Sequence, residues 1–141
     1  MDNRRFYGFI AVQIVAAVVL LAVAFAWPGA WNLQREIGTA LVLAGICAMA
    51  VARFQLGRSF SVKAEARTMV THGLYSRIRN PIYVFGMFLL AGFVMILRRP
   101  ILWLLVLVIA VVQIIRARRE ARVLEAAFGD AYREYRRKTW F

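Results

Sequence analysis

The sequence is poor in cysteine, histidine and acidic residues. Its 141 residues include one Cys, one His and 7 Asp and Glu together. A lone cysteine cannot form an internal disulfide, and a lone histidine without a second Cys or His offers no metal site. We therefore expect no metal ion, and we expect Cys47 to be a small packing residue inside an apolar helix.

Apolar and basic residues are abundant instead. Hydrophobic residues make up 62% of the chain, and 19 Lys and Arg give it a formal net charge of +12. A soluble domain of this length would be less apolar, so the composition favours a membrane protein of one domain. In a soluble protein this positive charge would suggest binding to nucleic acid. Here the basic residues separate apolar runs, which indicates contact with membrane lipids and no nucleic-acid partner.

Four apolar runs predict an all-α membrane protein with about four transmembrane helices. They cover residues 6–26, 37–52, 82–97 and 101–115. The first run is longer than the core of a signal peptide, so we expect a retained helix. The last two are short and separated only by Arg98-Arg99-Pro100. They are expected to form a tight hairpin, and whether that hairpin spans the bilayer fully stays open.

The chain after the hairpin changes character at Arg116. Apolar residues then recur at helical spacing and predict a C-terminal amphipathic helix on the cytoplasmic side that ends or bends at Gly129. Its apolar face comprises Ala117, Ala121, Leu124 and Phe128.

Small residues recur along the second apolar run. Gly38, Gly45 and Ala52 follow one another every seven residues. Small residues at such intervals let two helices approach closely in lipid, so we expect them to serve packing and not chemistry.

The distribution of basic residues predicts the topology. The segment 53–80 and the tail after residue 116 are strongly basic, and basic loops of membrane proteins lie on the cytoplasmic side. With four helices both termini are then cytoplasmic, in a bacterial-type inner membrane or its equivalent. Arg98 and Arg99 violate this rule and are expected to reach the far surface. The basic positions of the central segment are Arg53, Arg58, Lys63, Arg67, Arg77 and Arg79.

The segment 71–83 is polar, basic and aromatic although it lies between apolar runs. Gly73 permits a tight turn. Pro81 is suited to the first turn of a helix, and it disfavours helical geometry at Asn80. The free amides of that helix start, together with Arg77 and Arg79, would suit an anionic group.

This segment resembles the signature of the isoprenylcysteine carboxyl methyltransferases and their phospholipid methyltransferase relatives. The matching pattern is Thr-x-Gly-x-Tyr-x-x-x-Arg-x-Pro-x-Tyr, from Thr71 to Tyr83. Upstream, residues 56–61 look like the family's Leu-Gly-Arg-x-aromatic-Ser segment. Downstream, the matching positions are Glu120, Leu124, Phe128, Gly129, Tyr132 and Tyr135. Three blocks in the same order make the resemblance specific.

The resemblance implies an integral-membrane enzyme that uses S-adenosylmethionine to methylate a lipidic or apolar acceptor. It divides the chain into an N-terminal helical hairpin, residues 1–55, and a catalytic-type half, residues 56–141. It also implies catalytic roles for Arg79 and Asn80. The implied cofactor-binding residues are His72, Gly73, Tyr75, Pro81, Tyr83 and Glu120.

Each of these roles has a competing interpretation. Arg79 would also suit a lipid phosphate, Tyr75 and Tyr83 would suit an aromatic belt at the membrane surface, and Glu120 would suit an ion pair with Arg116. The chain departs from the family pattern at Asn80, where the family usually has His. It departs again at Ala121, where the family usually has a second Glu.

The acceptor stays open at this point. A carboxylate is already a nucleophile, whereas an amine must first lose a proton, and the sequence shows no obvious base for that step. We therefore expect carboxyl O-methylation. Phospholipid amine N-methylation is the nearest alternative, and a non-catalytic membrane protein that binds anionic lipid or a protein partner is the alternative of another class. The sequence does not indicate an oligomeric state.

Overall fold

The computed structural model describes the backbone of residues 3–56 and 69–141, with side chains from residue 11 onward in these ranges. This part of the chain is helical, which confirms the all-α prediction for it. Residues 57–61 of the upstream resemblance lie outside the described residues, as do the predicted basic positions Arg58, Lys63 and Arg67. The elements are α1 (Asn3–Ala26), α2 (Leu33–Leu56), the 3-10 helix η2 (Gly73–Ser76), α3 (Pro81–Leu97), α4 (Leu102–Phe128) and α5 (Asp130–Lys138).

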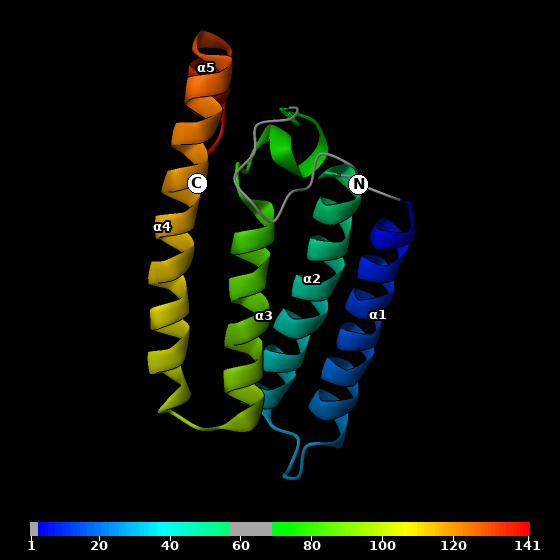
Figure 1. The fold of residues 1–141 in the computed structure, drawn as a ribbon. Coiled ribbons are helices and arrows are strands. Elements are labelled where there is room, and N and C mark those ends of the chain that lie inside the picture. Colours follow the sequence, from blue (N-terminus) through cyan, green and yellow to red (C-terminus); the bar gives the residue numbers. More distant parts are fainter. Residues whose placement is uncertain (1–2, 57–68) are drawn as a thin grey trace.

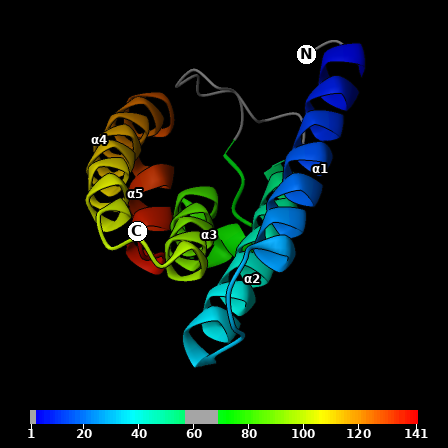
Figure 2. The ribbon, with the colours of Figure 1, turned by 90° about the horizontal axis from the view of Figure 1, so that it is seen from below.

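The four long helices lie side by side in chain order (Figure 1). Viewed along the bundle, α3 lies between α2 and α4, and α5 lies beside α4 (Figure 2). η2 lies at the same end of the bundle as the C-terminal half of α4, and the α1–α2 and α3–α4 turns lie at the other end. The segment between α2 and α3 and the C-terminal tail therefore meet at one end of the bundle.

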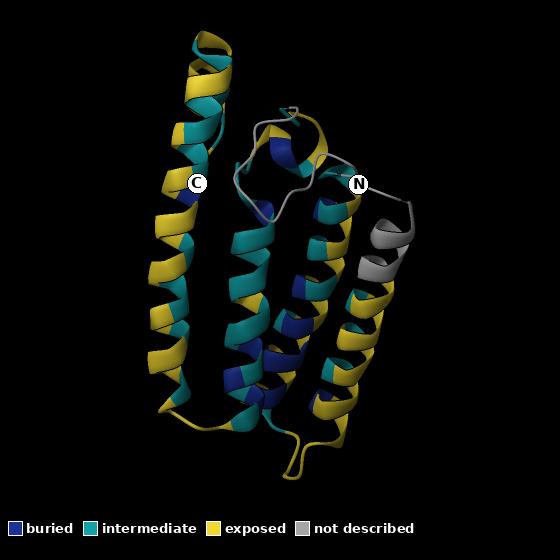
Figure 3. Cartoon of the chain, in the orientation of Figure 1, coloured by how far each residue is buried: buried dark blue, intermediate teal, exposed yellow. Residues whose placement is uncertain are grey.

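Glycines bring α2 and α3 into close contact. A Cβ atom added at Gly38 would lie 2.8 Å from the carbonyl oxygen of Gly92, and one added at Gly45 would lie 2.9 Å from Cβ of Leu89. Both glycines and Ala52 are buried, which confirms that the seven-residue stripe is a packing surface. The buried residues of the bundle gather along this contact (Figure 3).

A buried arginine joins α1 to α2. The side chain of Arg35 donates hydrogen bonds to the carbonyl oxygens of Gly29 (2.7 Å), Phe25 (3.1 Å) and Ala24 (3.2 Å). Its guanidinium also lies over the ring of Trp31, 4.3 Å from the centroid. Helix ends leave carbonyl groups without intrahelical partners, so Arg35 satisfies the end of α1 from the start of the next helix.

Helix α3 begins at Pro81, as predicted, and ends at Leu97. Arg98 then takes the left-handed conformation (φ 55°, ψ 35°) that starts the turn to α4. The segment after Arg116 was predicted as a separate amphipathic helix that follows the hairpin. The structure corrects this prediction. α4 runs without a break from Leu102 to Phe128, since no Gly or Pro interrupts it. The expected break at Gly129 is confirmed, and α5 follows it.

Among the described residues, α2 (Leu33–Leu56) is the helix that is long and apolar enough by itself to cross a membrane. The apolar helices Ala11–Ala26 and Pro81–Leu97 are shorter, so the count of four spans stays a prediction. The outward surfaces of α1 and α4 are nonetheless rich in exposed apolar side chains, which would suit a lipid environment. Examples are Val12, Val15, Val18, Leu104, Val108 and Val111.

Candidate functional site

The turn at the start of η2 is held by a side chain from α2. Gln55 accepts a hydrogen bond from the amide of Leu74 (2.7 Å) through its Oε1. Gly73 has a φ of +61°, and a Cβ atom there would overlap the Gln55 amide group. The amide of Tyr75 donates to the carbonyl oxygen of His72 (3.1 Å), whereas the His72 side chain is exposed. Gly73 therefore shapes this turn, as predicted, and His72 contributes through its backbone.

Tyr75 is the buried residue of η2. Only 6% of it is exposed, and its carbonyl oxygen accepts a hydrogen bond from the hydroxyl of Tyr135 on α5 (2.7 Å). Burial raises the pKa of Tyr75 above its ordinary value, and nearby Tyr135 raises it further, while Arg53 opposes the shift. The Tyr75 phenol is thus neutral at physiological pH, and its ring lies where the tail docks on the loop.

The C-terminal tail pairs with the Arg-x-Pro segment through its backbone. Ile78 and Trp140 form an isolated parallel β-bridge. The backbone amide of Arg79 donates to the backbone oxygen of Trp140 (3.1 Å), and the amide of Asn80 donates to that of Phe141 (2.9 Å). The amide of Trp140 donates to the carbonyl oxygen of Arg77 (2.9 Å). These three bonds fix the loop directly before the start of α3.

Arg79 holds a buried donor that is not used inside the described part of the chain. Its Nε atom is buried and has no hydrogen-bond partner among the described residues. Its charge lies close enough to Tyr135 to oppose the rise that burial causes in the pKa of that tyrosine. A buried donor without a partner is costly unless a ligand or water satisfies it. Arg79 therefore brings a positive charge, and one donor that no described residue satisfies, to the place where the loop meets the tail.

A second polar cluster connects α3 and α4. The hydroxyl of Tyr83 donates a short hydrogen bond to Oε1 of Glu120. Arg116 lies over the Tyr83 ring, 5.7 Å from the centroid. The ion pair between Glu120 and Arg116 that the helical spacing allowed does not form among the described contacts. The cluster instead places a carboxylate, a phenol and a guanidinium next to one another.

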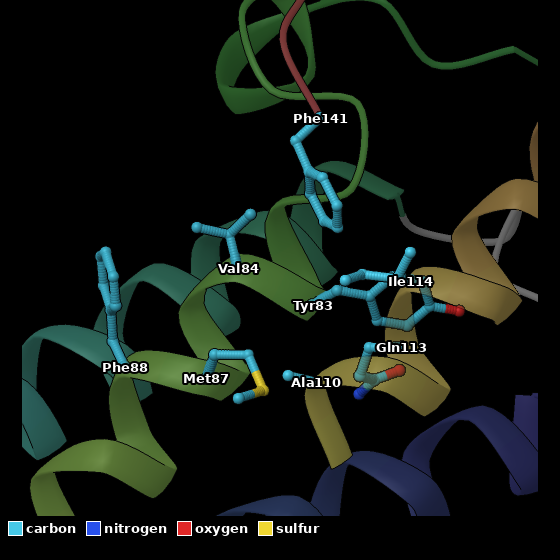
Figure 4. Close-up of a pocket in the computed structure, with 8 residues that line it drawn as sticks. All are labelled: Tyr83, Val84, Met87, Phe88, Ala110, Gln113, Ile114 and Phe141. Atoms are coloured by element: carbon cyan, nitrogen blue, oxygen red, sulfur yellow. The ribbon is translucent and has the colours of Figure 1, made fainter. Parts of the chain in front are cut away.

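An apolar cavity lies between α3 and α4 directly beside this cluster (Figure 4). Its volume is about 260 Å³, and Gln113 is the polar amide among its lining residues. The Oε1 atom of Gln113 is buried and has no partner within the described part of the chain. The close-up shows Phe141 and Tyr83 at one side of the cavity and Phe88 at the other. The lining residues are Tyr83, Val84, Met87, Phe88, Ala110, Gln113, Ile114 and Phe141.

The sequence of this region matches a known protein family. The sequence model of one family, the phospholipid methyltransferases, matches residues 33–131. The matched span begins at the first residue of α2 and includes Tyr75, Tyr83 and Glu120. The chain belongs to the phospholipid methyltransferase family. No significant match was found among curated proteins or among solved structures.

In this member of the family, the candidate residues fall into two groups at one end of the bundle. Tyr75 and Arg79 lie around the loop and tail, and Tyr83 and Glu120 connect α3 to α4. Asn80 and Pro81 form the junction between the groups, where Asn80 precedes the helix and its carbonyl oxygen accepts from the amide of Tyr83 (3.0 Å).

Several residues beside the candidate site were not singled out from the sequence. Arg116 had a signal, because it lies four positions before Glu120 on the same helix. Gln55, Gln113 and Phe141 had none, since each reaches the site through a contact that is distant in sequence. Gln55 contacts the η2 turn, and Gln113 and Phe141 line the cavity.

Proposed function

We propose that the chain is an integral-membrane methyltransferase that transfers a methyl group from S-adenosylmethionine to a lipidic acceptor. The observation that carries the proposal is the position of the Tyr83–Glu120–Arg116 cluster at the edge of the apolar cavity between α3 and α4. A hydrocarbon chain suits the cavity, and the reacting polar group of the same molecule would then lie against the cluster. Membership of a methyltransferase family supports the same conclusion.

The residues present fit the cofactor by their chemistry. S-adenosylmethionine, when bound, supplies an electrophilic methyl group on a sulfonium ion. Its carboxylate suits Arg79, whose Nε is buried without a partner among the described residues, and its ammonium suits Glu120. The ring of Tyr83, which lines the cavity, would offer a flat surface for the adenine or the sulfonium cation. Tyr75 is 6% exposed and would act by holding the loop in shape. His72, Gly73 and Pro81 would contribute backbone groups and the shape of the loop.

The chain's own residues would aim the acceptor and exclude water. Methyl transfer from a sulfonium is an in-line displacement, so the acceptor atom must be held near the methyl group in a dry site. The cavity lining supplies the apolar walls, and Phe141 lies next to Tyr83 at its edge. For a carboxylate acceptor, which needs no base, the Arg116 guanidinium would supply a planar partner. Carboxyl O-methylation of a lipidic acid is our first choice.

Phospholipid amine N-methylation is the second candidate. Two observations favour it: the family's description names phospholipids, and Glu120 places a carboxylate beside the cavity. In this alternative Glu120 would attract the protonated amine of the acceptor, in place of the cofactor's ammonium, and would accept its proton. The Tyr83 hydroxyl donates to the same carboxylate. A base-labile methylated product would indicate the ester, and a base-stable product would indicate the amine.

We further propose four membrane-spanning helices with both termini on the cytoplasmic side, where the cofactor is made. Reporter fusions after Phe54, Arg99 and Phe141 test this arrangement. A periplasmic signal from the fusion after Phe141 would contradict it.

The experiment for the proposed function is cofactor binding by the purified protein in nanodiscs. A ligand that binds only the folded state stabilises it by about 2.7 kcal/mol at a hundredfold excess over Kd. We expect S-adenosylmethionine to raise the midpoint of thermal unfolding, and we expect Arg79→Ala and Glu120→Ala to shift the response to higher cofactor concentration.

Arg133→Ala is the matched control for these two variants. Arg133 is an exposed arginine that pairs with Glu125 (2.9 Å) and Asp130 (3.0 Å), and surface ion pairs contribute little to stability. Equal losses in all three variants would favour lipid contact over cofactor binding. A well-folded sample that shows no response at millimolar cofactor would favour the non-catalytic membrane protein.

A further inference from the structure

The turn between α3 and α4 carries two adjacent arginines that the candidate site does not use. Arg98 and Arg99 are both exposed and directly follow the C-terminal end of α3, whereas Tyr83 lies in its first turn. The turn from α3 to α4 lies at the opposite end of the bundle from η2 (Figure 1). Because α3 has 17 residues, the two ends are about 25 Å apart. Arg98 and Arg99 make no ion pair within the described part of the chain. Their charge is therefore available to a ligand.

The two arginines line one cavity. Its volume is about 280 Å³, and none of the described residues that line it is acidic. Gln34 lies in the same lining, and its amide nitrogen already donates to the carbonyl oxygen of Met95 (3.1 Å). The remaining strong donors are the two guanidinium groups, which match the oxygens of a phosphate or carboxylate in a bidentate manner. The lining comprises Gln34, Val94, Arg98, Arg99, Pro100 and Trp103.

The backbone at Arg98 is consistent with a use for its side chain. Arg98 has a φ of 55°, a left-handed conformation that glycine adopts without strain at the end of a helix. An arginine here costs conformational energy that a glycine would not. Strain of this kind is a reason to look for a function.

The surroundings indicate a lipid and not a free anion. Trp103 is 46% exposed beside the cavity, and tryptophan is typical of the headgroup depth of a membrane. The apolar side chains Leu104, Leu105 and Leu107 are exposed on the first turns of α4 after it. A ligand that combines an anionic head with hydrocarbon would meet both kinds of surface.

We propose that this cavity binds the phosphate of an anionic phospholipid, at the membrane surface opposite to the candidate methyl-transfer site. Arg35, the other basic residue described at this end, is buried and bound to the end of α1, so it does not compete for the ligand. The site would hold the α3–α4 turn to the bilayer and would explain why two arginines lie on a side where membrane proteins carry few.

The test compares nanodiscs of phosphatidylcholine with nanodiscs of an equimolar phosphatidylcholine–phosphatidylglycerol mixture. The readouts are the midpoint of thermal unfolding and the lipid retained in native mass spectrometry, and neither depends on methyl transfer. We expect the protein to be more stable in the anionic nanodiscs and to retain phosphatidylglycerol. Arg98→Gln and Arg99→Gln should each weaken retention by about tenfold or more, because each removes charge-assisted hydrogen bonds.

Two further variants separate a specific site from general attraction. Arg99→Lys keeps the charge but loses the planar fork, so it should also lose most of the retention. Arg98→Gly should raise the unfolding midpoint in phosphatidylcholine, since it relieves the left-handed strain, and should abolish the gain from phosphatidylglycerol. Because Arg98→Gly should stay folded, it shows that a loss of lipid retention does not come from unfolding. Arg118→Gln, an exposed arginine in the C-terminal half of α4, should leave the gain unchanged.

Three results would overturn the proposal. One is full retention of phosphatidylglycerol by Arg99→Lys, which would indicate that positive charge alone is enough for retention. Another is an equal loss in Arg118→Gln, which would indicate a general effect of basic residues. The third is the same stabilisation by inorganic phosphate in phosphatidylcholine nanodiscs, which would indicate a site for a free anion.

Discussion

Replacing Gly92 by alanine tests the close packing of α2 against α3. The added Cβ atom would lie 2.5 Å from the carbonyl oxygen of Gly38 and 2.9 Å from Cγ2 of Val42. Overpacking of this kind costs about 1–3 kcal/mol, and a clash with backbone lies in the upper part of that range because no side-chain rotation relieves it. Alanine regains about 0.5–1 kcal/mol of helix propensity. The net loss should be about 1–2 kcal/mol.

Gly86→Ala on the same helix is the matched control. A Cβ atom there meets only the sulfur of Met49, at 3.8 Å, which is an ordinary contact. This variant should therefore keep the wild-type stability or gain up to about 1 kcal/mol from propensity alone. The assay is reversible unfolding in mixed micelles, with both variants and the wild type measured together. If Gly92→Ala proved as stable as Gly86→Ala, the close approach of the two helices would be wrong.

Two other predictions concern the ends of the bundle. Arg35→Met should destabilise the protein by about 2 kcal/mol or more, because the carbonyl oxygens of Ala24 and Phe25 at the end of α1 lose a charge-assisted partner. Unfolding in the same micelles measures this loss, and an unchanged stability would contradict the role of Arg35. Burial raises the pKa of Tyr135 from 10.0 to about 12, so the tail contact of its neutral hydroxyl with Tyr75 should be intact below pH 10 and be lost as the pH rises toward 12. Tyr135→Phe should lower the free energy of unfolding by about 0.5–1.5 kcal/mol at neutral pH, and it should not show the loss of tail contact at alkaline pH that the wild type shows. The rate at which a protease cleaves the tail, measured against pH, tests this. Identical pH profiles for the two proteins would contradict it.

Much of the fold could be predicted because the sequence marks its own helix ends. Pro81 begins α3 and Gly129 ends α4, where a fixed φ and a residue free to adopt positive φ act locally. Gly38 and Gly45 marked the packing surface of α2 because small residues at a regular interval leave one face of a helix open to a neighbour.

The parts that could not be predicted depend on contacts between residues far apart in sequence. Trp140 of the tail pairs with the loop through backbone groups of Arg77 and Arg79, and backbone hydrogen bonds leave no trace in residue type. Arg35 is only 4% exposed, and its residue type gives no sign of this burial. Its role depends on where the end of α1 lies, which local sequence does not specify.

The sequence named residues of the candidate site, but it did not predict how they are arranged. Tyr83 and Glu120 were both expected to bind the cofactor, yet the sequence linked Glu120 to Arg116 by helical spacing. The structure links Glu120 to Tyr83 on the neighbouring helix instead. The apolar cavity had no signal of its own, because its lining consists mainly of generic apolar residues of α3 and α4, to which Gln113 and the distant Phe141 are added.

The most direct test of methyl transfer is the incorporation of tritium from methyl-labelled S-adenosylmethionine into an organic extract of membranes that contain the protein. The account predicts label above that of membranes lacking the protein, a strong loss in Glu120→Ala, and nearly full label in Arg133→Ala. An extract without label, from membranes in which the folded protein binds the cofactor, would contradict it.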